Sequence, residues 1–133
     1  MRLKIPFPSY RWLKVRKVNR IIKKIDEQIK TFETLQRIWA KRYELAIEHK
    51  LGPNARSFKK TFEDIYSERS NLTIIKSIFE AFEENMRKST SHEEIDLIDK
   101  KVDLKNQEIE SRVKKINILI EEKNDEYVSL RRK

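Results

Sequence analysis

Basic residues are concentrated at the start of this chain, in a number that would suit the binding of a polyanion. The first 24 residues hold nine of the 31 lysines and arginines and no carboxylate, and the net charge of the whole chain is +9. Many weak phosphate contacts add up to salt-sensitive binding, so the pattern predicts an anionic membrane surface or nucleic acid as partner. The nine cations are Arg2, Lys4, Arg11, Lys14, Arg16, Lys17, Arg20, Lys23 and Lys24.

Apolar and aromatic residues lie between these cations and favour a membrane over nucleic acid. Side chains of this kind can enter the acyl boundary of a bilayer while neighbouring lysines and arginines contact lipid phosphates. A second interpretation stays open, in which the aromatic rings pack on the end of the folded domain and the cations are merely solvated. The residues concerned are Leu3, Ile5, Phe7, Tyr10, Trp12 and Leu13.

Catalytic and cofactor-binding patterns are missing from the sequence. Phosphate-binding loops need several glycines, and Gly52 is the only one in the chain. The histidines His49 and His92 are far from any likely set of metal ligands, and there is no cysteine. The sequence therefore predicts a protein that is not an enzyme, with no cofactor and no metal site.

The composition favours extended helices over a compact core, because 40% of the residues are charged. Pro6 and Pro8 predict a basic, apolar N-terminal arm over residues 1–9, with Ser9 as N-cap of a helix over 10–51. Residues 10–133 then form a single elongated helical domain. The apolar positions of the first helix recur in steps of three and four, broken only by Gln36, at Val18, Ile22, Ile25, Ile29, Phe32, Trp39, Tyr43 and Ala46.

The segment Gly52, Pro53 and Asn54 predicts a hairpin turn, with glycine ending the first helix and asparagine capping the second. The second helix is expected over 54–88, antiparallel to the first because the connection is short. Its apolar positions are Phe58, Phe62, Ile65, Leu72, Ile75, Phe79, Phe82 and Met86.

A third helix is expected over 91–131, opened by a capping box of Ser91 and Glu94. The fold class is thus all-α, a long helical hairpin with a third long helix. The periodicity leaves open whether this third helix packs on the hairpin in a loose three-helix bundle or extends away from it.

Together these features resemble the core of ESCRT-III proteins, and in particular the archaeal CdvB-type cell-division members. The similarity covers about Tyr10 to Lys88 and is carried by the basic amphipathic start, residues 16–36, the hairpin turn, the pair Ala55 and Arg56, and Arg69 within the second helix.

The resemblance implies a protein without enzymatic turnover that polymerises with itself on anionic membranes and bends or severs them. It also implies remodelling by a AAA+ ATPase and a cytoplasmic location, peripheral on the inner face of the membrane. The chain departs from the family in having no acidic tail after Lys133, which puts ATPase recruitment in doubt. We expect Arg69 to pair with a carboxylate across the hairpin or a subunit contact. The assembly candidates are Arg56, Lys59, Lys60 and Arg69.

Two alternatives remain. The chain is also similar in outline to DNA-binding helical coat proteins of filamentous archaeal viruses, which would place it in a virion, where the same cations would neutralise phosphates. The other alternative is a coiled-coil adaptor whose apolar positions bind another helical protein.

Overall fold

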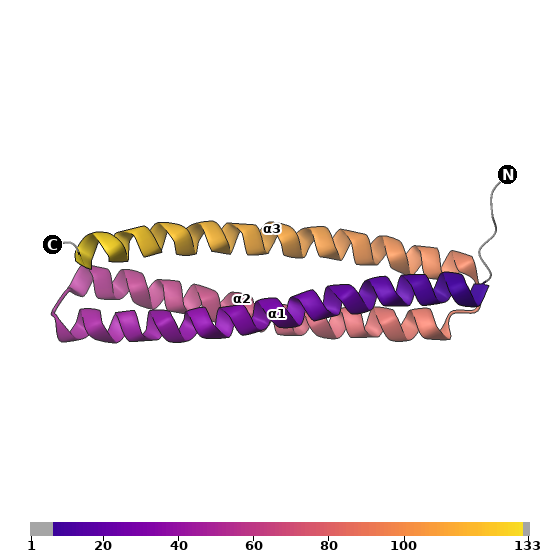
Figure 1. The fold of residues 1–133 in the computed structure, drawn as a ribbon, viewed down its shortest axis with the longest axis horizontal. Helices are drawn as coiled ribbons and strands as arrows, with labels where there is room; N and C mark the ends of the chain where they lie inside the picture. Colours follow the sequence, from indigo (N-terminus) through magenta and orange to yellow (C-terminus); the bar gives the residue numbers. More distant parts are fainter. Residues whose placement is uncertain (1–6, 132–133) are drawn as a thin grey trace.

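The computed structural model describes residues 7–131, and within that range the regular elements are three long helices. Helix α1 is Phe7–Glu48, α2 is Gly52–Lys88 and α3 is His92–Arg131. They lie side by side in an elongated bundle, with α2 antiparallel to both α1 and α3 (Figure 1). The predicted all-α fold, a long helical hairpin with a third long helix, is confirmed.

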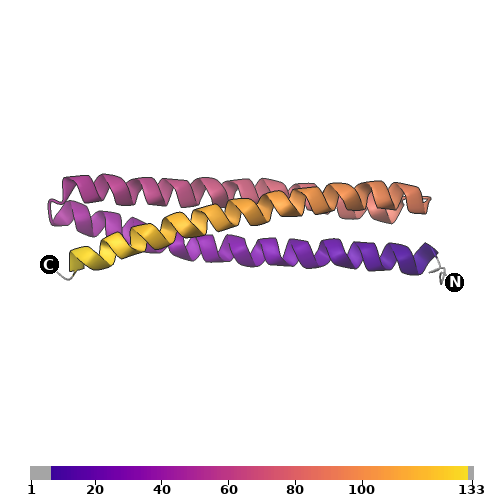
Figure 2. The ribbon, with the colours of Figure 1, turned by 90° about the horizontal axis from the view of Figure 1, so that it is seen from above.

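Helix α3 is packed on the hairpin along the length of the rod, as the two perpendicular views agree (Figures 1 and 2). Three of its apolar residues, Val102, Ile109 and Ile116, belong to the same buried cluster as the core residues of α1 and α2. Of the two arrangements that the periodicity left open, the structure has the closed three-helix bundle.

The core is built from residues that recur every seven positions on each helix. Because 3.6 residues make one helical turn, a strict spacing of seven keeps one side facing the core only if the helices wind around one another. The bundle is therefore a coiled coil, narrow and apolar along its axis and charged on its surface. The repeating buried residues are Val18, Ile25, Phe32, Trp39 and Ala46 in α1, Phe58, Ile65, Leu72, Phe79 and Met86 in α2, and Ile95, Val102, Ile109 and Ile116 in α3.

Helix α1 begins at Phe7, earlier than the predicted start at Tyr10. Proline is compatible with the first helical turn, where backbone N–H groups have no partner within the helix, so Pro8 does not prevent helix formation. Ser9 consequently lies inside the helix and is not its N-cap. Of the predicted arm over residues 1–9, residues 7–9 are helical and residues 1–6 lie outside the described part of the chain.

The hairpin turn lies at residues 49–51, just before the predicted residues Gly52, Pro53 and Asn54, which are the first residues of α2. Helix α1 ends at Glu48, and Lys50 takes the left-handed conformation with φ 59°. The N–H of Leu51 donates to the carbonyl of Ala46 at 2.9 Å and that of Lys50 to Ile47 at 3.1 Å, which is the hydrogen-bond pattern of a Schellman motif.

The predicted roles of Gly52 and Asn54 at this turn are therefore wrong. Gly52 opens α2 without a positive φ, and Pro53 follows it in the first turn. Asn54 lies in that turn and donates from Nδ2 to Glu126 of α3 at 3.2 Å. The position that a glycine would favour is taken by Lys50, two residues before the glycine that the sequence pattern indicated.

Replacing Lys50 by glycine should stabilise the protein, because the left-handed conformation is costly for a residue with a Cβ atom. We expect Lys50→Gly to raise the free energy of unfolding by about 0.5 to 1 kcal/mol, after allowance for the larger chain entropy of glycine. Urea denaturation followed by circular dichroism measures the change. Lys41→Gly, in the middle of α1, is the control and should lower stability by about 1 kcal/mol; a loss in both variants would contradict the prediction.

The start of α3 matches the predicted cap at Ser91. Its Oγ accepts a hydrogen bond from the N–H of Glu94 at 3.2 Å. The carboxylate of Glu94 turns back to the N–H of Thr90 at 2.9 Å, one residue before the position that a standard capping box would use.

Candidate functional site

The basic segment of α1 presents two different faces, because side chains three, four and seven residues apart share one side of a helix. One face holds Tyr10, Lys14 and Lys17 and is turned toward α3. A second face, turned away from the core residues Val15 and Val18, holds exposed cations and apolar side chains. The residues predicted as one polyanion-binding group are thus divided by the fold.

On the inner face, two lysines of α1 form ion pairs with aspartates of α3. The Nζ of Lys14 lies 2.8 Å from Asp99, and Lys17 lies 2.9 Å from Asp99 and 2.6 Å from Asp103. The Asp99 side chain is only 13% exposed, so water screens these pairs less than it screens ordinary surface pairs. We call Lys14, Lys17, Asp99 and Asp103 the clasp.

The pKa values in the clasp follow from these contacts. Burial alone would raise the pKa of Asp99, but hydrogen bonds from Lys14 and Lys17 outweigh it and hold the pKa below its ordinary value. Burial would likewise lower the pKa of Lys17, and hydrogen bonds to Asp103 and Asp99 outweigh it and raise the pKa. Both groups are therefore charged at neutral pH, and each stabilises the charged form of the other.

Tyr10 belongs to the same contact between α1 and α3. Its hydroxyl donates to Asp96, and its ring lies against the ring of His92 with centroids 4.5 Å apart. The hydrogen bond to Asp96 raises the pKa of Tyr10 to about 12, with burial as the next cause. The second interpretation of the aromatic residues, packing on the end of the domain, is thus correct for Tyr10.

The outer face of α1 is the part of the basic segment that remains available to a partner. Trp12 is 56% exposed and Leu13 is 46% exposed. The guanidinium of Arg16 lies over the Trp12 ring, 5.0 Å from its centroid. Within residues 7–131, none of the cations on the outer face forms an ion pair. We define the outer face as Trp12, Leu13, Arg16, Arg20 and Lys23, all of them exposed. Lys24 follows Lys17 by seven residues and lines a groove between α1 and α3, so it lies outside this face.

A shallow groove runs beside the outer face, between α1 and the end of α2. Its volume is about 420 Å³ and it is lined by Arg11, Trp12, Arg16 and Arg87 among others. Arg87 is held by Glu83 at 2.9 Å, and Arg11 donates to the carbonyl of Ser89 at 2.5 Å. Arg11 therefore ties α1 to the connection between α2 and α3, and its side chain is part of the fold.

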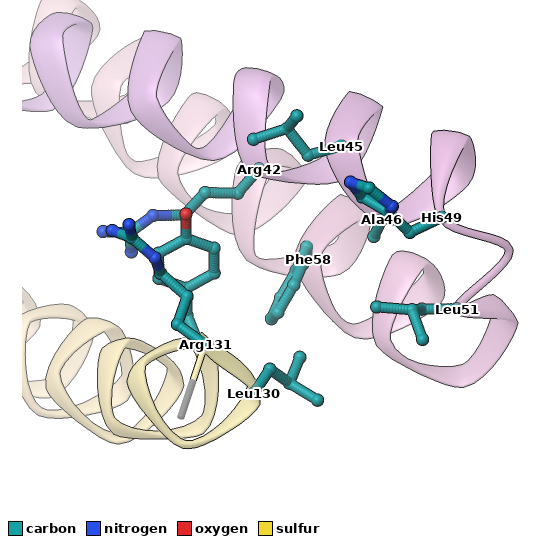
Figure 3. Close-up of a pocket in the computed structure, with 9 residues that line it drawn as sticks. Arg42, Leu45, Ala46, His49, Leu51, Phe58, Leu130 and Arg131 are labelled. Atoms are coloured by element: carbon teal, nitrogen blue, oxygen red, sulfur yellow. The ribbon is translucent and has the colours of Figure 1, made fainter. Parts of the chain in front are cut away.

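A second groove, of about 460 Å³, lies at the opposite end of the rod, beside the hairpin turn (Figure 3). Leu45, Leu51 and Leu130 line it, with Phe58 at its floor. The hollow is largely apolar and open, with Arg42, His49, Tyr127 and Arg131 as its polar side chains.

Arg42 joins α1 to α3 beside this groove. Its guanidinium lies 4.6 Å from the Trp39 ring centroid and 4.0 Å from that of Tyr127, and it donates to Asn124 at 2.9 Å. The Phe58 ring contacts both aromatic rings, at 5.5 and 6.0 Å between centroids. Burial lowers the pKa of Arg42 from its ordinary value, with the nearby Arg131 adding to the effect. This cluster fastens the end of α3 to the hairpin.

The remaining predicted residues lie elsewhere. Arg69 of α2 pairs with Glu33 of α1 at 3.8 Å and lies over the Tyr66 ring at 5.3 Å, which confirms the expected carboxylate partner across the hairpin. Arg56, Lys59 and Lys60 are exposed on α2. The predicted membrane-binding residues Arg2, Leu3, Lys4 and Ile5, and the side chain of Phe7, lie outside the described part of the chain.

The described residues were also searched for metal and membrane-spanning features. Between residues 7 and 131, no three or more histidine, cysteine or acidic residues gather closely enough to hold a metal ion. None of the three helices described is long and apolar enough to cross a bilayer.

Sequence reasoning missed the residues that close the bundle. Asp96, Asp99 and Asp103 follow one another by three and four, which places their carboxylates on one side of α3. Tyr10, Lys14 and Lys17 have the matching spacing on α1. The matching spacing was visible in the sequence, but the two sets of residues can pair only if the two helices lie parallel.

In comparisons with known protein families, with curated proteins and with solved structures, no match was found.

Proposed function

We propose that this protein is a non-enzymatic, membrane-associated structural protein of the ESCRT-III-like kind. It attaches to anionic membranes through the outer face of α1 and assembles into filaments that bend or sever the membrane. The observation that carries the proposal is the exposure of Trp12 and Leu13 among cations that have no ion pair within residues 7–131.

The geometry of the outer face suits a lipid surface better than duplex DNA. Exposed tryptophan and leucine gain free energy by leaving water for the interfacial region of a bilayer, whereas a phosphate backbone offers them no apolar surroundings. Each cation near an anionic leaflet adds about 1 kcal/mol of attraction. Because the face runs along one side of a straight helix, all of its side chains can reach a flat surface at once.

The charged surface of the bundle offers sites for filament contacts. The long rod exposes most of its charged residues, and many weak lateral contacts between rods add up when they act together. Remodelling by a AAA+ ATPase and a peripheral location on the inner face of the membrane belong to the same proposal. They rest on the resemblance of the hairpin region to ESCRT-III proteins.

Co-sedimentation with anionic vesicles, neutral vesicles and duplex DNA tests the proposal. We expect the triple variant Arg16→Glu, Arg20→Glu, Lys23→Glu to weaken anionic vesicle binding about a hundredfold, since three attractions of about 1 kcal/mol are lost. The matched control Lys41→Glu, Lys50→Glu, Arg131→Glu makes the same change in charge at exposed cations toward the other end of the rod. Equal losses in both variants would show that net charge, and not the outer face, governs binding.

A second variant separates the membrane from nucleic acid. Trp12→Ser with Leu13→Ser removes the apolar part of the outer face and leaves every cation in place. Binding to anionic vesicles should fall while binding to DNA stays unchanged. If the wild-type protein sediments only with DNA, in regular nucleoprotein rods, the coat-protein interpretation replaces the membrane proposal. Deletion of residues 1–17 is a poorer test, because it removes Val15 from the core and both lysines of the clasp.

A further inference from the structure

Helix α3 carries an exposed apolar stripe on the side that faces away from the bundle. Leu97 is 60% exposed, Leu104 is 68% exposed and Ile118 is 49% exposed. Each follows a buried core residue of α3 by two positions, which is about 200° around a helix. The stripe therefore has the same spacing of seven as the core, on the opposite side of the same helix, with Ser111 completing the series.

Charged residues flank this stripe and alternate in sign along it. Lys100 and Lys101 are followed by Glu108, then by Lys114 and Lys115, and then by Glu121 and Glu122, all exposed. Among the ion pairs within residues 7–131, Glu108 is matched by Lys105 at 3.0 Å and Arg112 at 4.0 Å. The other six flanking charges have no ion pair within the same range.

An apolar spacing of seven with flanking charges of alternating sign is the pattern by which one coiled-coil helix selects another. The charges also specify the partner and its direction. A second copy of the same helix, antiparallel and with Ser111 on the two-fold axis, sets Lys100 and Lys101 opposite Glu122 and Glu121 of the second copy. In the same register, Leu104 meets Ile118 and Glu108 meets Lys114.

Other registers of the antiparallel helix pair give less favourable contacts. A shift that sets Leu97 opposite Ile118 places Lys101 opposite Lys114, and like charges in contact repel. A shift that sets Leu104 opposite its own copy restores charge pairing but loses both contacts between leucine and isoleucine. The register centred on Ser111 also overlaps the whole of α3, because Ser111 lies at the middle of His92–Arg131.

We infer that the outer side of α3 is a homodimer surface, on which a second copy of this chain docks antiparallel with its two-fold axis at Ser111. Two rods then lie side by side, with their basic ends at opposite ends of the pair, about 60 Å apart for a helix of this length. That separation keeps the concentrated positive charge of the two copies from opposing association. The inference is independent of membrane binding and concerns the protein in solution.

A charge-swap experiment tests the surface. Sedimentation velocity at low ionic strength, without vesicles or DNA, should show the wild-type chain in a concentration-dependent monomer–dimer equilibrium. The variant Lys100→Glu, Lys101→Glu and the variant Glu121→Lys, Glu122→Lys should each associate about tenfold more weakly or worse, since attraction becomes repulsion. An equimolar mixture of the two should recover wild-type affinity, because every reversed charge then meets its opposite.

The matched control is Lys30→Glu, Lys41→Glu on α1, with the same change in net charge at exposed lysines and no expected effect on dimerisation. Lowering the net positive charge reduces general repulsion, so weaker association of the α3 lysine variant can only come from lost contacts. A wild-type protein that stays monomeric, or a mixture that fails to recover affinity, would overturn the inference.

Cross-linking tests the direction of the pair, because the chain contains no cysteine of its own. Ser111→Cys should form a disulfide-linked dimer on mild oxidation, since the two copies of this residue meet at the axis. Leu97→Cys should not, because in the antiparallel pair its two copies lie far apart. Efficient cross-linking through Leu97→Cys would show a parallel pair and overturn the proposed arrangement.

Discussion

Trp39→Ala should lower the free energy of unfolding by about 3 to 5 kcal/mol, the largest loss expected from a single substitution in this chain. Trp39 is fully buried, and its ring contacts Phe58 of α2 and the guanidinium of Arg42. Truncation leaves a cavity between the helices and removes one of the two rings between which Arg42 is held. Such a loss is a large fraction of the stability of a domain of this size.

The second tryptophan is a matched control for this prediction. The chain has two, and Trp12 is 56% exposed on the outer face. Trp12→Ala should change stability by less than about 0.5 kcal/mol. Urea denaturation followed by circular dichroism measures both variants, and the fluorescence of the remaining tryptophan reports burial in each. Comparable losses for the two would contradict the placement of Trp39 in the core.

Asp99→Asn should destabilise the protein by about 1 to 3 kcal/mol at neutral pH, because one substitution removes the shared partner of Lys14 and Lys17. The asparagine keeps the size of the side chain, so the change isolates the charge. We expect the loss to be local, with faster amide hydrogen exchange in the first turns of α3 and in the facing part of α1.

The pKa of Asp99 also predicts the direction in which stability changes with pH. The pKa of Asp99 is lower in the folded protein than its ordinary value of about 3.9. Its contribution is therefore fully present above that ordinary value and is lost as the pH falls through the lower folded value. Wild-type stability should decline on acidification below about pH 4, and the decline should be smaller in Asp99→Asn.

At alkaline pH, the stability should instead fall as the pH rises. The pKa of Lys17 is raised by its aspartate partners, and that of Tyr10 is raised to about 12. The stabilisation that each provides is present below its unfolded pKa and is lost as the pH rises through the folded pKa.

Asp125→Asn, an exposed change near the other end of α3, is the control for Asp99→Asn. An acid response of the same size in both asparagine variants would argue against the clasp.

The helices and their order were predictable because each depends on neighbouring residues. Apolar residues every three or four positions indicated the three helices, and the single glycine with its following proline indicated the hairpin turn. Only the ends shifted, since Pro8 is tolerated in a first turn and Lys50 takes the left-handed position. The serine cap of α3 and the carboxylate partner of Arg69 were also visible from spacing alone.

The candidate site was predicted as one group of cations with apolar and aromatic residues between them. Helical geometry separates Trp12 and Arg16 from Lys14 and Lys17, but the sequence does not say which side meets a neighbouring helix. The structure assigns the two lysines to α3 and leaves the tryptophan and arginine exposed. It thereby narrows the predicted partner surface to one side of α1.

The sequence by itself determined three amphipathic helices, a tight turn between the first two, and a basic start that contains aromatic residues. Only the tertiary structure decided that α3 closes on the hairpin, parallel to α1. The physical reason is that periodicity indicates which side of a helix avoids water, but not which partner covers it. The contacts that select the partner, such as those of Asp99 and Arg42, join residues more than 80 positions apart and form only after the helices align.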